Sequence, residues 1–221
     1  MNLCVIFDLD GTLVDSESLC NQAFLDLVPE IPDNIDELVR RYRGARFATI
    51  LTELATRHGI AFPTDFESHY RTRVACLFET NLKPMPGALE MLKELAYPRC
   101  IASGGPLAKI RHSLEISGLA PFFNDRLYSS YEVGSWKPEP GLFLHAAEKM
   151  GYPPAQCVVV EDSDLGVAAA TRAGMRAVRF SQDATEQLRS QTPTIDDLRT
   201  LPRALAGFQT VASGPPFVPA R

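Results

Sequence analysis

The sequence lacks several features that would indicate whole classes of protein. None of its apolar runs is as long as the roughly 18 residues that a membrane-spanning helix needs, so we expect no membrane partner. The N-terminus has no basic region followed by an apolar stretch, so no secretory signal is predicted. Basic residues are not in excess, since 22 Lys and Arg face 27 Asp and Glu for a net charge of −5, and we expect no nucleic-acid partner.

Cysteine is also sparse, with five residues and no C-x-x-C pair, which argues against a disulfide framework or a thiolate metal site. Cys4, Cys100 and Cys157 lie in or beside apolar runs and are predicted to be buried free thiols. These absences predict a cytoplasmic protein. Apolar residues make up 45% of the chain and charged residues 22%, as in ordinary globular domains with a sizeable core.

Short apolar runs, typical of strands buried on both faces of a parallel sheet, recur along the chain. They are Leu3–Phe7, Arg99–Ala102, Cys157–Val160 and Ala177–Phe180, with a weaker candidate at Arg126–Ser130. Helical patterns separate them, at Gly87–Leu95, Leu107–Ile116, Pro140–Met150 and Leu165–Ala173. Strands that alternate with helices predict an α/β fold with a Rossmann-like, doubly wound parallel sheet.

Residues 15–82 interrupt this alternation, because they contain helical patterns and no convincing strand. The last of these helices is expected to begin at Thr64, where Thr64-x-x-Glu67 has the spacing of a capping box. We predict an α/β core formed by residues 1–14 and 83–200, with residues 15–82 inserted as a helical cap domain. Residues 201–221 are predicted to be a flexible tail, since Pro, Gly and small residues occur there without periodicity.

Two carboxylates, Asp8 and Asp10, end the first predicted strand and are followed at once by Gly11 and Thr12. In extended backbone the i, i+2 spacing points both side chains the same way, at the sheet edge where α/β proteins bind ligands. Crowded carboxylates repel each other, which suits a nucleophilic Asp beside one that exchanges protons. An acidic turn that merely ends a strand is the alternative.

Acids also follow the third strand, as Glu161, Asp162 and Asp164. If the first and third strands are neighbours, Asp8 and Asp162 approach one another. Several carboxylate oxygens at one edge are suited to Mg²⁺. The alternative is that Ser163 or Asp164 simply caps the following helix.

Two weaker motifs complete the set. Ser103 and Gly104 end the second strand, where a hydroxyl and backbone N–H groups can hold phosphate oxygens, although many such sequences are only turns. Lys137 is followed by Pro138 and Pro140, which stiffen the backbone after it. Lys137 could therefore be a cation fixed near the carboxylates, or simply a surface lysine in a proline-rich loop. An anionic nucleophile, metal ligands, a hydroxyl and a cation together indicate phosphoryl transfer.

These motifs, in this order, resemble those of the haloacid dehalogenase superfamily over about residues 3 to 180. They read Phe7-Asp8-Leu9-Asp10-Gly11-Thr12-Leu13-Val14-Asp15-Ser16-Glu17, Ser103, Lys137-Pro138-x-Pro140 and Glu161-Asp162-Ser163-x-x-Gly166-Val167. The chain is similar to the branch that contains β-phosphoglucomutases and sugar phosphatases, particularly the 6-phosphogluconate phosphatase type. It departs from the common pattern at Trp136 and Gly141, where the superfamily often has Gly and Asp.

The resemblance implies a hydrolase that forms an aspartyl-phosphate on Asp8, with Asp10 as general acid and base. Its phosphate-binding residues would be Ser103, Gly104 and Lys137. Its Mg²⁺ ligands would be Asp8, the Asp10 backbone carbonyl and Asp162, with Glu161 assisting. The implied partner is a small phosphorylated substrate, and the chain would be a monomer or homodimer.

Arginines gather in the predicted cap, where Arg40, Arg41, Arg43 and Arg46 surround a helix end. Solvated charges that complement the helix dipole are one explanation. The other is that Arg43 or Arg46, beside Gly44, selects the substrate through a second anionic group.

The function predicted is therefore a Mg²⁺-dependent phosphatase acting on a sugar phosphate or phosphosugar acid. A sugar phosphomutase, a phospho-aspartate switch and a non-catalytic binding module remain as alternatives.

Overall fold

A six-stranded parallel sheet organises the protein, whose structure is a computed structural model that describes residues 3–189 and 191–210. Its spatial order is β3-β2-β1-β4-β5-β6. The strands are β1 (Cys4–Phe7), β2 (Arg99–Ser103), β3 (Leu127–Ser129), β4 (Cys157–Glu161), β5 (Arg176–Phe180) and β6 (Thr194–Ile195). The predicted α/β class is confirmed, and every strand that was predicted is present.

Both faces of the sheet are covered by helices, which explains why the strands are apolar throughout. Cys4 and Ile6 of β1 face α8 (Gly141–Met150) and α9 (Asp164–Arg172). Val5 and Phe7 face the opposite side, toward α5 (Ala88–Glu94) and α6 (Leu107–Ile116). Cys100 and Cys157 are buried and free like Cys4, as predicted, whereas Cys76 is exposed.

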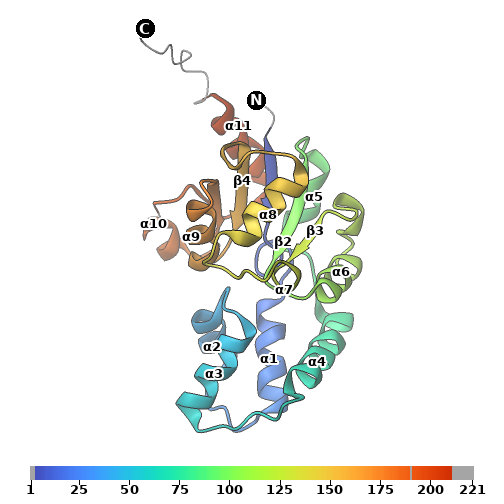
Figure 1. The fold of residues 1–221 in the computed structure, drawn as a ribbon, viewed down its shortest axis with the longest axis vertical. Coiled ribbons are helices and arrows are strands. Elements are labelled where there is room, and N and C mark those ends of the chain that lie inside the picture. The colour runs from blue at the N-terminus through green and yellow to red at the C-terminus, as the bar shows by residue number, and fades with distance from the viewer. Residues whose placement is uncertain (1–2, 190, 211–221) are drawn as a thin grey trace.

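Four helices form a second layer beyond the carboxyl ends of the strands (Figure 1). They are α1 (Glu17–Leu27), α2 (Ile35–Tyr42), α3 (Phe47–His58) and α4 (Phe66–Asn81). Phe24, Phe47 and Tyr70 join three of them through ring contacts of 4.4 to 5.9 Å between centroids. The predicted capping box at Thr64 is wrong, because Asp65 occupies the N-cap position of α4 and makes no side-chain capping bond.

The C-terminal part of the chain is more ordered than predicted. Residues 201–210 form α11 (Leu201–Thr210), and the side chains of Leu201 and Leu205 are fully buried. Burying each is worth about 1.5 to 3 kcal/mol, so the prediction of a flexible tail is wrong for this stretch. Residues 211–221 lie outside the described part.

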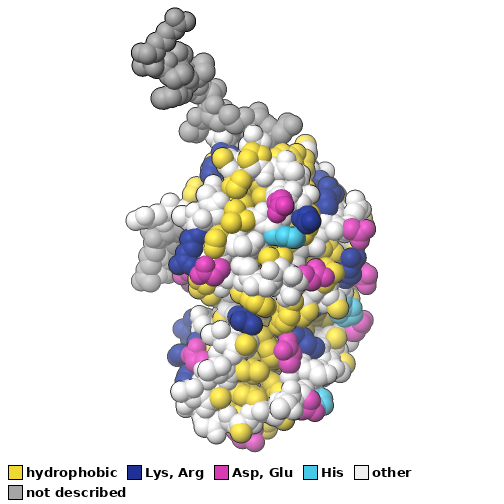
Figure 2. All heavy atoms as spheres, viewed as in Figure 1, with side chains coloured by type: hydrophobic (Ala, Val, Ile, Leu, Met, Phe, Trp, Pro, Cys, Tyr) yellow, Lys and Arg dark blue, Asp and Glu magenta, His cyan; other side chains and the backbone are white. Residues whose placement is uncertain are grey.

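The remaining short elements are α7 (Ser130–Val133), α10 (Ala184–Arg189), η1 (Ala120–Phe122), η2 (Pro154–Gln156) and η3 (Leu198–Thr200). Among the described residues, no helix has the length and apolar character needed to cross a bilayer. Charged side chains of both signs are scattered over the face shown in Figure 2, with no large patch of one sign.

Candidate active site

Neighbouring strands bring the acidic motifs together. Because β1 pairs with β4, Asp8 follows the end of one strand beside the end of the other, and its backbone N–H donates to the Val160 carbonyl at 3.0 Å. Carboxylate oxygens of Asp8, Glu161 and Asp162 all lie within 4.8 Å of one another. The prediction that Asp8 and Asp162 approach one another is confirmed.

Lys137 lies against these acids rather than on the surface. Its Nζ is 2.5 Å from Asp8 Oδ1 and also contacts Glu161, and its side chain is only 6% exposed. The interpretation as a surface lysine is therefore wrong. Burial raises the pKa of Asp8 to about 7, and the charges of Glu161 and Asp10 add to this rise while the Lys137 ammonium opposes it.

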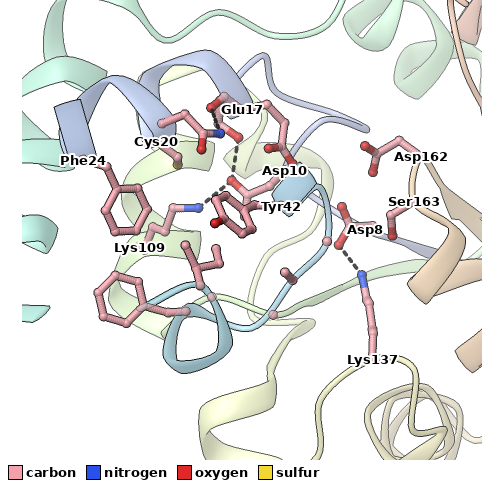
Figure 3. A pocket seen from close by; sticks show the side chains of 18 of the residues that line it. Asp8, Asp10, Glu17, Cys20, Phe24, Tyr42, Lys109, Lys137, Asp162 and Ser163 are labelled. Atoms are coloured by element: carbon pink, nitrogen blue, oxygen red, sulfur yellow. Dashed lines mark hydrogen bonds and ion pairs between the residues drawn. The ribbon is translucent and has the colours of Figure 1, made fainter. Parts of the chain in front are cut away.

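Asp162 stands at the other side of Asp8 (Figure 3). Its carboxylate accepts a hydrogen bond from Thr12 Oγ1 at 3.2 Å and lies 3.7 Å from Arg43 Nε. Burial, together with the charges of Glu161 and Asp8, holds its pKa well above the ordinary value. These acids carry more negative charge than the neighbouring cations offset, and their hard oxygen ligands fit a divalent cation such as Mg²⁺.

Glu161 is fixed in place by the loop that follows it. Its carboxylate accepts hydrogen bonds from the backbone N–H and the hydroxyl of Ser163, both at 2.8 Å. Ser163 also caps α9, since its Oγ accepts from the Gly166 N–H at 3.1 Å. A Cβ on Gly166 would lie 1.9 Å from the Glu161 carboxyl, so glycine is required there. Ser163 therefore caps the helix, as predicted, and the neighbouring carboxylates of Glu161 and Asp162 are not used as caps.

Asp10 occupies a different environment from Asp8, although both line the same cavity. Its Oδ1 lies 2.5 Å from Lys109 Nζ and accepts a hydrogen bond from the Ser16 hydroxyl at 2.6 Å (Figure 3). Burial acts to raise its pKa, but Lys109 and Ser16 outweigh burial, and the pKa lies below its ordinary value. Neither Lys109 nor Ser16 was assigned a role from the sequence.

Glu17 is a further acid that the sequence reasoning did not single out. It begins α1 and lines the cavity near Asp10. Burial and the charge of Asp10 raise its pKa to about 7.

The loop that follows β2 borders the cavity, and Ser103 is the last residue of the strand. The Ser103 side chain is fully buried, and its Oγ accepts from the Gly105 N–H at 3.1 Å. Gly104 and Gly105 line the cavity, whereas Ser103 does not. The loop is held by Ser129, whose hydroxyl donates to the Gly105 carbonyl at 2.6 Å.

The cavity has a volume of about 120 Å³ and lies between the sheet edge and the helical layer. The sheet side supplies mainly acids, two lysines and backbone. The helical side supplies mainly Phe24, Tyr42, Phe47, Tyr70 and Arg71. This is room for a small polar molecule, with charged groups at one end and rings at the other.

The arginines predicted to select the substrate do not line this cavity. Arg46 lies over the Trp136 ring instead, and Arg43 pairs with Asp162. Gly44 does line it, and approaches so closely that a Cβ there would lie 2.6 Å from Ser163 Oγ. Among the described residues, the cavity-lining cation contributed by the helical layer is Arg71, which is a further candidate for contact with the substrate.

Comparison with known proteins identifies the protein family to which this fold and this arrangement of acids belong. Residues 3–174 match the haloacid dehalogenase-like hydrolase family, and the chain belongs to this family. The predicted resemblance is confirmed.

Individual proteins similar to this chain indicate which members of the family it resembles. The chain is 36% identical over 182 residues to a 6-phosphogluconate phosphatase of Escherichia coli, covering 81% of this chain and 82% of that protein. A conserved haloacid dehalogenase-like protein from Agrobacterium tumefaciens has a TM-score of 0.80 at 29% identity, covering 95% and 100% of the two chains. A putative β-phosphoglucomutase from Thermotoga maritima has a TM-score of 0.71 at 26% identity, covering 93% and 99%. The family match and the phosphatase relative support the predicted enzyme class, a phosphoric monoester hydrolase.

Proposed function

We propose that the protein is a Mg²⁺-dependent phosphatase that hydrolyses a small phosphomonoester through an aspartyl-phosphate on Asp8. One observation carries this proposal. Asp8 is held by Lys137 within a group of carboxylates that fits a cation, while Asp10, two residues away, is held separately by Lys109 and Ser16. A nucleophile and a proton carrier need two such different environments.

In the first step, a carboxylate oxygen of Asp8 attacks phosphorus, and the bond from phosphorus to the substrate oxygen breaks. Lys109 and Ser16 favour the ionised form of Asp10 in the free protein, so Asp10 takes up a proton from the incoming phosphomonoester monoanion and then gives it to the departing alkoxide. In the second step, Asp10 takes a proton from water, whose oxygen attacks phosphorus. The bond to Asp8 then breaks and inorganic phosphate leaves, so that Asp8 is again free and Asp10 again carries a proton.

Phosphate would be bound by the Lys137 ammonium, the Ser103 hydroxyl and backbone N–H groups at Gly104. Mg²⁺ would be held by Asp8, the Asp10 backbone carbonyl and Asp162, with Glu161 assisting. When bound, the ion would offset the repulsion between the phosphoryl group and Asp8. Lys137 provides charge on the opposite side of Asp8 from Asp162.

We further propose that residues 15–82 act as a cap over an α/β core formed by residues 1–14 and 83–200. The position of α1 to α4 over the carboxyl ends of the strands supports this division (Figure 1). The cap would exclude bulk water from the phosphoryl transfer step. Its aromatic wall and Arg71 would meet the part of the substrate remote from the phosphate.

The substrate class we propose is a sugar phosphate or a phosphosugar acid. The name of the Escherichia coli relative, a 6-phosphogluconate phosphatase, supports the second kind. Arg71 supports it independently, because this residue lines the cavity and its Nε is buried without a hydrogen-bond partner, while its Nη2 pairs with Glu67. A carboxylate matches the geometry of a guanidinium and accepts strong, charge-assisted hydrogen bonds from it.

The proposal is tested by measuring phosphate release from a panel of phosphomonoesters. The wild-type protein is compared with Asp8→Asn and Asp125→Asn. Asp125→Asn is the matched control, since that side chain is 91% exposed. Asp8→Asn should lower phosphate release by at least about 10⁴-fold and leave the circular dichroism spectrum unchanged. Substantial activity in Asp8→Asn would refute the nucleophile. An isomerised sugar phosphate without phosphate release would show a mutase instead.

A further inference from the structure

A stacked pair of side chains joins the helical layer to the sheet part of the molecule outside the cavity. The Arg46 guanidinium, at the N-cap position of α3, lies 3.8 Å from the centre of the Trp136 ring. Trp136 directly precedes Lys137, which contacts Asp8. Neither Arg46 nor Trp136 lines the cavity. The pair therefore links the proposed cap to the loop that carries Lys137, without reaching the substrate.

Further contacts place Trp136 in a small interface. Its ring meets Tyr131 edge-on at 5.6 Å. The Tyr131 hydroxyl receives a hydrogen bond from Arg71 Nη2 at 2.9 Å and donates to Glu67 at 3.0 Å, both on α4. Residues 131–136 thus contact both α3 and α4.

We propose that Arg46 and Trp136 are positioning residues that hold the cap docked on the core while Lys137 engages Asp8. This inference rests on the proposed phosphatase function, but the contact itself can be tested apart from it. An exposed cation–π contact changes the population of a docked state by about two- to fivefold. Because the planar guanidinium stacks on the ring and an ammonium does not, Arg46→Lys should restore only part of the effect.

Trp136 is the one tryptophan among the 221 residues, so the intrinsic fluorescence reports directly on this contact. Arg46→Ala should increase the acrylamide quenching constant of the full-length protein by about twofold, without any substrate. Arg40→Ala is the matched control, since Arg40 is exposed and donates to the Asp36 carbonyl within its own helix, α2. Equal quenching of wild type, Arg46→Ala and Arg40→Ala would overturn the proposed contact.

Kinetics test the positioning role. Arg46→Ala should raise KM about two- to fivefold for neutral and acidic sugar phosphates alike, with kcat nearly unchanged, because substrate binding compensates for the weaker docking. Unchanged KM, or a rise confined to acidic substrates, would overturn the role, the latter by showing direct substrate contact. If no phosphomonoester is hydrolysed, the proposed function fails, and the quenching result still decides whether the contact exists.

Discussion

The two sides of the cavity differ in how their charges are satisfied. On the sheet side, charged groups contact one another, as in Lys137 with Asp8 and Lys109 with Asp10. On the helical side, Arg71 is only partly engaged: its Nη2 pairs with Glu67 at 3.1 Å, and its guanidinium lies among rings, 4.8 Å from the centre of Phe47 and 5.4 Å from that of Tyr70. Its Nε has no hydrogen-bond partner.

This difference suggests a division of work between the two sides. Groups that are already paired and buried are held in position before substrate arrives, as chemistry at phosphorus requires. A cation with an unused donor is available to a ligand. We therefore expect changes on the sheet side to affect turnover of every substrate, and changes on the helical side to distinguish one substrate from another.

Metal removal should have the largest effect, because it leaves Asp8, Glu161 and Asp162 with more negative charge than Lys137 and Arg43 offset. Exhaustive chelation should reduce phosphate release to background, and added Mg²⁺ should restore it. Asp162→Asn should raise the Mg²⁺ concentration needed for half-maximal activity by at least about 10-fold. Full activity after chelation would show that the sheet side of the cavity works without a metal ion.

Loss of Lys109 should have the next largest effect. Lys109→Met removes the cation that holds Asp10, and we expect kcat to fall by about 10²-fold with little change in KM. Lys93→Met, at an exposed position on α5, is the matched control. An effect on KM alone would show that Lys109 binds substrate and does not position Asp10.

Loss of Arg71 should have the smallest but the most selective effect. Arg71→Ala should raise KM about 10-fold for a phosphosugar acid and much less for a neutral sugar phosphate, because it removes one charge-assisted contact. Arg71→Lys should recover part of this difference. Arg73→Ala, two residues further along α4 and paired with Asp26, is the control. Equal changes for both substrates would contradict the division proposed above.

The sheet side could be predicted from the sequence because its residues follow strands that are themselves easy to recognise. Asp8 and Asp162 come together through one strand pairing, and parallel strands place their carboxyl ends at a common edge. Lys109 was missed, although it had a detectable signal. A cation in the first turn of a helix opposes the helix dipole, which indicates a nearby acid.

The helical side of the cavity could not be predicted, because the positions of its side chains depend on tertiary packing, which leaves no local pattern in the sequence. Arg71 is one of many arginines, and its place in the cavity follows from how α4 packs against α1. The arginines that did form a local cluster are engaged elsewhere, Arg46 by Trp136 and Arg43 by Asp162.

The C-terminal helix could have been predicted. Leu201, Leu205 and Phe208 have i, i+4, i+7 spacing, and Pro202 at its start is compatible with a helix. The spacing was obscured by the Pro and Gly residues around it.

The most direct test of the account is to identify the group that receives phosphorus. The protein, supplied with Mg²⁺ and a hydrolysed substrate, would be quenched in acid within the first turnover, digested and analysed by mass spectrometry. We predict one phosphoryl group on the peptide that contains Asp8, absent from Asp8→Asn and lost on further incubation before quenching. A protein that releases phosphate while Asp8 remains unmodified at every time point would contradict the central claim.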